Sequence, residues 1–229
     1  MNDASPPAPS VEVPDGWVEM ESTTEEVFSV SKVTVTATTV VYEDKRLRER
    51  VVADAGATVG TEADSETEAA VGTEAEADAD SETETVADPG AGGAFHRFAF
   101  ASRLRLRPTT KPSKPLTKLV TSRAKAGFAD RLEARGMTGV EERETRRFRV
   151  DRTEATLVGY DAACPVGGRR LAVDGWVAVW PDDDGDGRGD YFVAGGAYPT
   201  RVLEGAGLGD VIEPGRFRDD LFAIVRSVR

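Results

Sequence analysis

Residues 53–88 carry 12 acidic side chains, no Lys or Arg, and no apolar residue larger than valine. Burial of so little apolar surface cannot offset the entropy lost on ordering, about 1 to 2 kcal/mol per residue. The tract also repeats itself at uneven spacing, because residues 59–63 recur as 71–75 while residues 64–68 recur as 80–84. Such drift is typical of low-complexity expansion rather than of a solenoid. We therefore expect an acidic disordered insert over residues 53–93.

The insert divides a chain of 229 residues. This length suits one domain, since domains commonly contain about 100 to 200 residues. The Pro- and Ser-rich start runs up to a turn signal at Pro14-Asp-Gly16, which indicates a disordered N-terminus over residues 1–14. We expect a single domain over residues 15–229, interrupted by the insert.

The cysteine count and the length of the apolar runs indicate the cellular compartment of the protein. Cys164 is the only cysteine, so no internal disulfide can form, as is usual in a reducing compartment. Charges interrupt every apolar run, and none approaches the roughly 20 apolar residues of a membrane helix. The first residues lack the basic end and apolar core of a secretory signal. We expect a soluble cytoplasmic protein with no membrane partner.

Hydrophobic periodicity gives the expected fold class. Period-two alternation predicts strands, and apolar residues at helical spacing predict amphipathic helices. The expected strands cover residues 27–42, 95–106, 148–160, 171–180 and 191–202, and the expected helices cover 116–136 and 217–228. Strands and helices do not alternate as in a parallel sheet, so we expect an α+β fold. Its sheet is mainly antiparallel, with two packed amphipathic helices, one of them C-terminal.

Two resemblances agree with this expectation. The order of elements resembles the PsbP-type α+β fold, in which helices flank a central antiparallel sheet and a helix ends the chain. The segments Tyr42–Asp44, Phe98–Leu104, Gly175–Trp176 and Gly195–Pro199 resemble an uncharacterised family of proteins from halophilic archaea. The net charge of −12 and the six Lys against 23 Arg also resemble the amino-acid composition of proteins from halophilic archaea. These resemblances imply a fold and no activity, and the family does not require the acidic insert.

One acidic loop has the spacing of half a calcium site. Asp182, Asp184, Asp186 and Asp190 stand at loop positions one, three, five and nine, with Gly187 at position six. Oxygen ligands at alternate positions suit calcium. Val193 stands at position twelve, where a bidentate Glu belongs, and strands rather than helices flank the loop. We favour a solvated hairpin turn and keep a calcium site as the alternative.

A basic stretch follows the acidic insert. Residues 97–152 carry 16 Lys or Arg and six acidic residues. Its members include Arg97, Arg103, Arg105 and Arg107 on one face of a strand, followed by Lys111 and Lys114. A surface of this kind can bind a polyanion. No helix-turn-helix, zinc-finger or stacking-aromatic motif accompanies it. We favour a solvated face and do not expect nucleic acid as a partner.

Catalytic motifs are scarce in this sequence. His96 is the only histidine and Cys164 the only cysteine, so a His-based triad has no recognisable partner and a structural zinc site lacks ligands. Our leading hypothesis is a non-enzymatic binding or accessory domain that needs no cofactor. Its partner is left open, with a protein as one candidate. The alternatives are a metal-dependent enzyme that uses residues 182–190 with bound calcium, and a weak polyanion binder that uses residues 97–152.

Overall fold

The computed structural model describes residues 5–30, 33–59, 97–182 and 189–229. In this part of the chain one antiparallel sheet has the strand order β1-β2-β3-β7-β6-β5-β4. The strands are β1 (Trp17–Val30), β2 (Val33–Asp44), β3 (Phe98–Arg107), β4 (Thr138–Val150), β5 (Thr153–Val166), β6 (Arg169–Pro181) and β7 (Tyr191–Glu204). The helices are α1 (Lys45–Val59), α2 (Lys114–Ala134) and α3 (Pro214–Ser227). No helix in these ranges is long and apolar enough to span a membrane.

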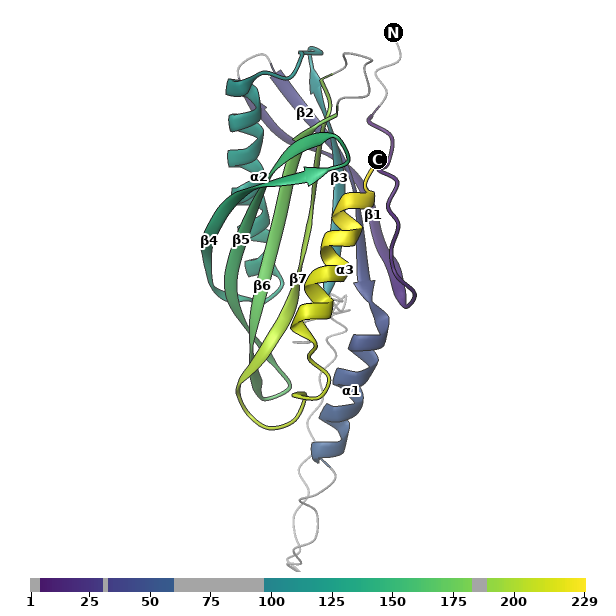
Figure 1. Cartoon of the computed structure of the whole chain (residues 1–229), viewed down its shortest axis with the longest axis vertical. Coiled ribbons are helices and arrows are strands. Elements are labelled where there is room, and N and C mark those ends of the chain that lie inside the picture. Colours follow the sequence, from purple (N-terminus) through teal and green to yellow (C-terminus); the bar gives the residue numbers. More distant parts are fainter. Residues whose placement is uncertain (1–4, 31–32, 60–96, 183–188) are drawn as a thin grey trace, which may run out of the picture.

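Helices α2 and α3 cover opposite faces of the sheet. Neighbouring residues of a strand point to opposite faces of the sheet. The neighbours Gly175 and Trp176 of β6 therefore show which face each helix covers. A Cβ atom at Gly175 would lie 3.1 Å from the ring of Phe128 in α2. Trp176 instead packs edge-on against Phe222 of α3, with ring centroids 5.4 Å apart. Figure 1 shows α3 in front of the sheet and α2 behind it. We call these sides the α3 face and the α2 face.

Strand β3 lies inside the sheet, and its alternation assigns its side chains to these two faces. Phe100 stacks on Phe128 of α2, with ring centroids 5.8 Å apart. Residues of the same parity as Phe100 therefore lie on the α2 face, and the arginines of the other parity lie on the α3 face. Strands β2 and β7 flank β3 on its two edges, and helix α3 contacts its α3 face.

The expected mainly antiparallel sheet is confirmed, and the expectation of two helices is wrong. The fold is a mixed one dominated by its sheet, with α1 as a third helix. Asp44 directly precedes α1, and its Oδ1 caps the helix by accepting a hydrogen bond of 3.1 Å from the backbone N–H of Leu47. Leu47 and Val51, one turn apart, are buried. Of the expected insert, residues 53–59 belong to α1 and residues 60–93 lie outside the described part.

Residues 5–14, where we expected disorder, lie against the folded domain. Ser10 and Arg229 exchange two backbone hydrogen bonds, of 2.8 and 3.0 Å. The Thr38 hydroxyl of β2 donates a 2.7 Å hydrogen bond to the carbonyl of Pro6. A Pro-rich segment has few backbone hydrogen bonds of its own. Here it obtains them from the end of the chain and from the sheet.

Candidate functional site

The loop with calcium-like spacing connects β6 to β7, and its ends contact arginines of β3. Arg103 Nη2 lies 2.5 Å from Asp182 Oδ2, and Arg103 Nε lies 3.3 Å from Asp190 Oδ2. Arg105 Nη2 lies 3.0 Å from the same oxygen of Asp190, whose side chain is 1% exposed. These guanidinium groups already neutralise the two carboxylates that a cation would need.

The calcium hypothesis also requires Asp184 and Asp186, the other two acidic residues of that loop. Asp184 and Asp186 lie outside the described residues. Within the described ranges, no three His, Cys, Asp or Glu side chains gather as a metal-binding group. The calcium site therefore stays a prediction.

The predicted polyanion-binding residues do not form one continuous surface. Arg103 and Arg105 bind carboxylates, as described above. Arg97 precedes β3 and Arg107 ends it, so they lie at opposite ends of the strand. Lys111 and Lys114 are exposed just before and at the start of α2, where the Ser113 side chain caps the helix. Binding of a polyanion by these residues stays a prediction.

Arg97 is the centre of a buried charge network at one end of the sheet. Its side chain is 3% exposed and lies between the rings of Trp17 and Phe217, at 4.8 and 4.4 Å from their centroids. Arg97 Nη1 donates to Asp44, and Nη2 donates to Asp220 and to the Phe217 carbonyl, each at 3.0 Å. The network joins β1, the β2–α1 junction, β3 and α3.

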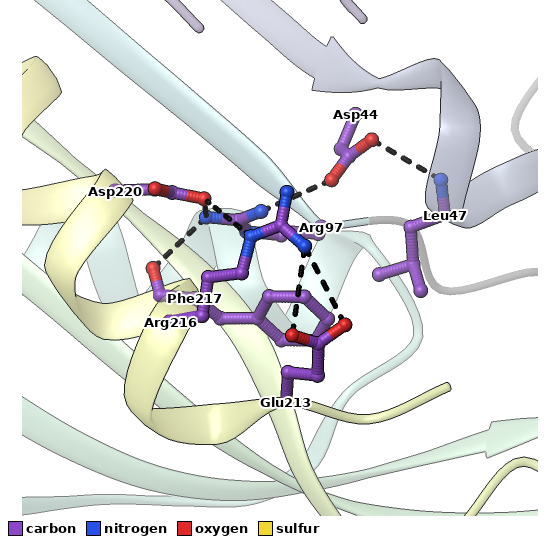
Figure 2. Close-up of polar contacts among 7 residues, drawn as sticks. All are labelled: Asp44, Leu47, Arg97, Glu213, Arg216, Phe217 and Asp220. Carbon is purple, nitrogen blue, oxygen red and sulfur yellow. Dashed lines mark hydrogen bonds and ion pairs between the residues drawn. The ribbon is translucent and has the colours of Figure 1, made fainter. Parts of the chain in front are cut away.

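A second arginine extends this network towards solvent. Figure 2 shows Arg216 beside Asp220 and Glu213. Its guanidinium group forms ion pairs with the carboxylates of Glu213, at 3.5 Å, and Asp220, at 4.0 Å. Asp44 uses its other oxygen to cap α1, as Figure 2 also shows. Each described carboxylate here meets a cation or a backbone donor, and none of the described residues of the network is a nucleophile such as Ser, Cys or Lys. The arrangement clamps four elements together rather than providing acid–base chemistry.

The α2 face contains a cleft of about 460 Å³ between α2 and the β1–β2–β3 side of the sheet. Helix α2 packs on β4 and β6 and leaves this other side uncovered. The cleft has an apolar floor formed by Ala37, Phe100, Leu104 and Val193 of the sheet, and Val120 and Phe128 of α2 belong to its wall. Its volume lies within the range of about 300 to 1,000 Å³ that is usual for small-molecule sites. We call it the α2 cleft.

Two hydroxyl groups lie together in this otherwise apolar floor. Thr39 of β2 and Ser102 of β3 are directly opposite each other in the sheet. Their hydroxyl oxygens are 2.8 Å apart, and both side chains are buried. A buried hydroxyl needs a hydrogen-bond partner, and each supplies the other's. Each oxygen also keeps further lone-pair capacity, so the pair gives the floor one polar point.

Gly127 opens the wall of the α2 cleft. It stands inside α2, where glycine costs about 1 kcal/mol relative to alanine. A Cβ atom there would meet no other atom within 4 Å. The position therefore faces open space, and its lack of a side chain widens the cleft at a cost to the helix.

Arginines of α2 stand along the rim of the cleft. Arg131 lies over the ring of Phe100, 5.0 Å from its centroid, and Arg123 lies over Phe28 at 5.8 Å. Burial lowers the pKa of Arg131, although Glu21 and Glu25 of β1 act in the opposite direction. The opposite bank, formed by β1, is acidic.

None of the cleft residues was among the predicted site residues. The sequence contains two signals that point to it. Ser102 is a polar residue at a position of β3 where its neighbours of the same parity are Phe100 and Leu104. Gly127 interrupts a helical pattern at a position where glycine costs about 1 kcal/mol relative to alanine.

The chain belongs to the family described as Domain of unknown function (DUF6517), whose model matches residues 57–229. No match was found among curated proteins or among solved structures. The matched range includes α2 and β3, which supply one wall and much of the floor of the α2 cleft. It excludes β1 and β2, which supply the opposite bank.

Proposed function

We propose that this protein is a non-enzymatic binding domain that holds a small, largely apolar molecule in the α2 cleft. The observation that supports this most directly is the buried hydroxyl pair of Thr39 and Ser102 in the apolar floor. Specific small-molecule sites commonly combine apolar walls with a few polar groups that fix the orientation of the ligand. The apolar surface provides affinity, and the hydroxyl pair provides one hydrogen-bonding point.

The chemistry around the cleft favours binding over catalysis. The Ser102 hydroxyl meets another hydroxyl rather than a general base, and a serine nucleophile needs such a base. Cys164 is 2% exposed, and burial raises its pKa to about 11. Its thiol therefore stays protonated and unreactive at neutral pH. A single cysteine, which cannot form an internal disulfide, also fits the cytoplasmic location that we propose.

The two alternative functions have weaker support. A metal-dependent enzyme would require Asp182 and Asp190 to exchange arginine for a cation. A polyanion binder would require Arg97, Arg103 and Arg105 to leave their carboxylates. The resemblance to haloarchaeal proteins and to the PsbP-type fold adds no activity to either alternative.

The proposal is tested by filling the cleft from Gly127. Gly127→Leu places an aliphatic side chain in open space and removes a helix-destabilising glycine, so the variant is expected to fold. The probe is 1-anilinonaphthalene-8-sulfonate, an aromatic amphiphile of suitable size. We expect the natural chain to bind it saturably with one site, and Gly127→Leu to weaken this binding about tenfold or more, measured by fluorescence titration.

Gly215→Leu is the matched control. Gly215 lies in the first turn of α3, and a Cβ atom there also meets nothing within 4 Å. It is remote from the cleft and should leave probe binding unchanged. Equal binding by the natural chain and by Gly127→Leu would refute the proposal. A concentration-dependent dimer that Gly127→Leu abolishes, seen by sedimentation, would identify a second copy as the occupant and would refute it as well.

A further inference from the structure

Arg131 is a partly buried cation in the wall of the α2 cleft. Its guanidinium group lies over Phe100 and forms no hydrogen bond or ion pair with any residue in the described part of the chain. A guanidinium group has five N–H donors, and donors removed from water usually have partners. The ring face of Phe100 partly stabilises the positive charge of Arg131 but accepts no hydrogen bond from its N–H groups.

The charges around Arg131 come from both banks of the cleft. Glu21 and Glu25 of β1 attract it from a distance without forming an ion pair. These two carboxylates, together with Glu26 and Asp130, are exposed to water. Exposed charges act weakly because water and salt screen them, whereas a partly buried charge acts through a lower effective dielectric constant. The charge preference of the cleft is therefore set by the partly buried Arg131, and Arg135, which lies over Phe98 and has the same charge, acts in the same direction.

We infer that the ligand of the α2 cleft is an amphipathic anion whose carboxylate, sulfonate or phosphate group pairs with Arg131. A planar guanidinium group matches such oxyanions with two parallel hydrogen bonds. The apolar part of the ligand then lies on Phe100 and Phe128, towards the hydroxyl pair. This inference rests on the proposed function, because it assigns a ligand class to the same cleft.

Three probes with the same ten-carbon chain separate charge from apolar contact: decanoate, decanol and decyltrimethylammonium. Binding is measured by displacement of 1-anilinonaphthalene-8-sulfonate below the aggregation limit of each probe. We expect decanoate to bind about tenfold more tightly than decanol, as for a hydrogen bond to a charged group, and decyltrimethylammonium to bind most weakly.

Arg131→Gln should remove this preference. The affinity for decanoate should fall about tenfold, to the level of decanol, while the affinity for decanol stays unchanged. Arg226→Gln is the matched control, because Arg226 of α3 also stacks on a phenylalanine, 4.7 Å from the ring centroid of Phe148. It lies on the α3 face and should leave all three affinities as they are.

The outcomes distinguish this inference from the proposed function. Equal affinity of the natural chain for decanoate and decanol, with both lost in Gly127→Leu, overturns the inference and supports the proposed function. Tightest binding of decyltrimethylammonium overturns the inference, because the acidic bank of β1 then governs the cleft. Failure of all three probes to displace 1-anilinonaphthalene-8-sulfonate overturns the inference, and absence of saturable binding of that dye itself overturns both.

Discussion

The arginines in and beside β3, on the α3 face, and the arginines of α2, on the α2 face, have different partners. On the α3 face, Arg97, Arg103 and Arg105 each meet a carboxylate at 2.5 to 3.0 Å. On the α2 face, Arg123 and Arg131 lie over phenylalanine rings and form no ion pair with the residues that the structure describes. The same side chain therefore has two roles. Where carboxylates surround it, arginine holds elements together, and where they do not, it remains available to a ligand.

This comparison also explains why a basic sequence stretch is a poor guide to polyanion binding. Arg97 finds Asp44 and Asp220, which are 53 and 123 residues away in the chain. Pairing over such separations is a property of the fold and not of local composition. The useful distinction is between paired and unpaired arginines.

Arg97→Ala should give the largest effect and tests the structural role of the α3 face. The substitution leaves Asp44 and Asp220 without their shared cation and empties the space between Trp17 and Phe217. Breaking a buried ion pair costs about 3 to 5 kcal/mol. We expect a loss of this size in the free energy of unfolding, measured by chemical denaturation followed by tryptophan fluorescence.

Arg131→Gln is the counterpart of Arg97→Ala on the other face. Because Arg131 only stacks on a ring, its loss should cost less than about 1 kcal/mol. If the two substitutions destabilise the protein equally, the distinction between the faces is wrong.

Asp190→Asn should cause the next largest loss in the free energy of unfolding. It compares a buried carboxylate that binds arginine with an exposed one. Asp190 is 1% exposed and binds both Arg103 and Arg105. Loss of hydrogen bonds to charged groups at such a site costs about 1.5 to 3 kcal/mol. The matched control is Asp161→Asn, because Asp161 binds Arg143 but is 57% exposed. That exposed pair should contribute less than about 1 kcal/mol, and equal changes in melting temperature would show that burial of Asp190 adds nothing.

The hydroxyl pair should give the smallest effect and tests the polar element of the α2 face. Ser102→Ala leaves the Thr39 hydroxyl buried without this partner and should cost about 1 kcal/mol. The double variant Ser102→Ala/Thr39→Val should cost no more than the single one, because it leaves no unpaired hydroxyl. A double-mutant cycle measures this coupling, and purely additive losses would mean that the two hydroxyls do not depend on each other.

Elements with a clear hydrophobic period could be predicted from the sequence. Residues Phe98–Arg107 alternate over their whole length, and α2 and α3 contain apolar residues at helical spacing. Strand β4 was largely missed because it lies at the edge of the sheet and is exposed along most of its length. An edge strand with two exposed faces has no apolar alternation to detect. Helix α1 was missed because Leu47 and Val51 are the only buried residues among those of its side chains that the structure describes, and two residues make a short apolar stripe.

The candidate site was harder to predict than the fold. Thr39 and Ser102 are 63 residues apart in the chain, and Phe100 meets Phe128 only because α2 folds back onto the sheet. The predicted charged residues were visible because they cluster in sequence, whereas the cleft is formed by ordinary apolar residues from separate elements. Ser102 and Gly127 were the available local signals, and both become informative only when their neighbours in space are known.

The two backbone hydrogen bonds between Ser10 and Arg229 make circular permutation of this chain feasible. Ends that lie side by side can be joined by a short linker, and new ends can be opened elsewhere. Opening the chain between Val59 and Arg97 would place α2, β3–β7 and α3 first and α1, β1 and β2 in one contiguous C-terminal block. In that order the block ends on α1, so stepwise truncation from the new C-terminus would remove α1 and then β2 before it reached the acidic bank on β1.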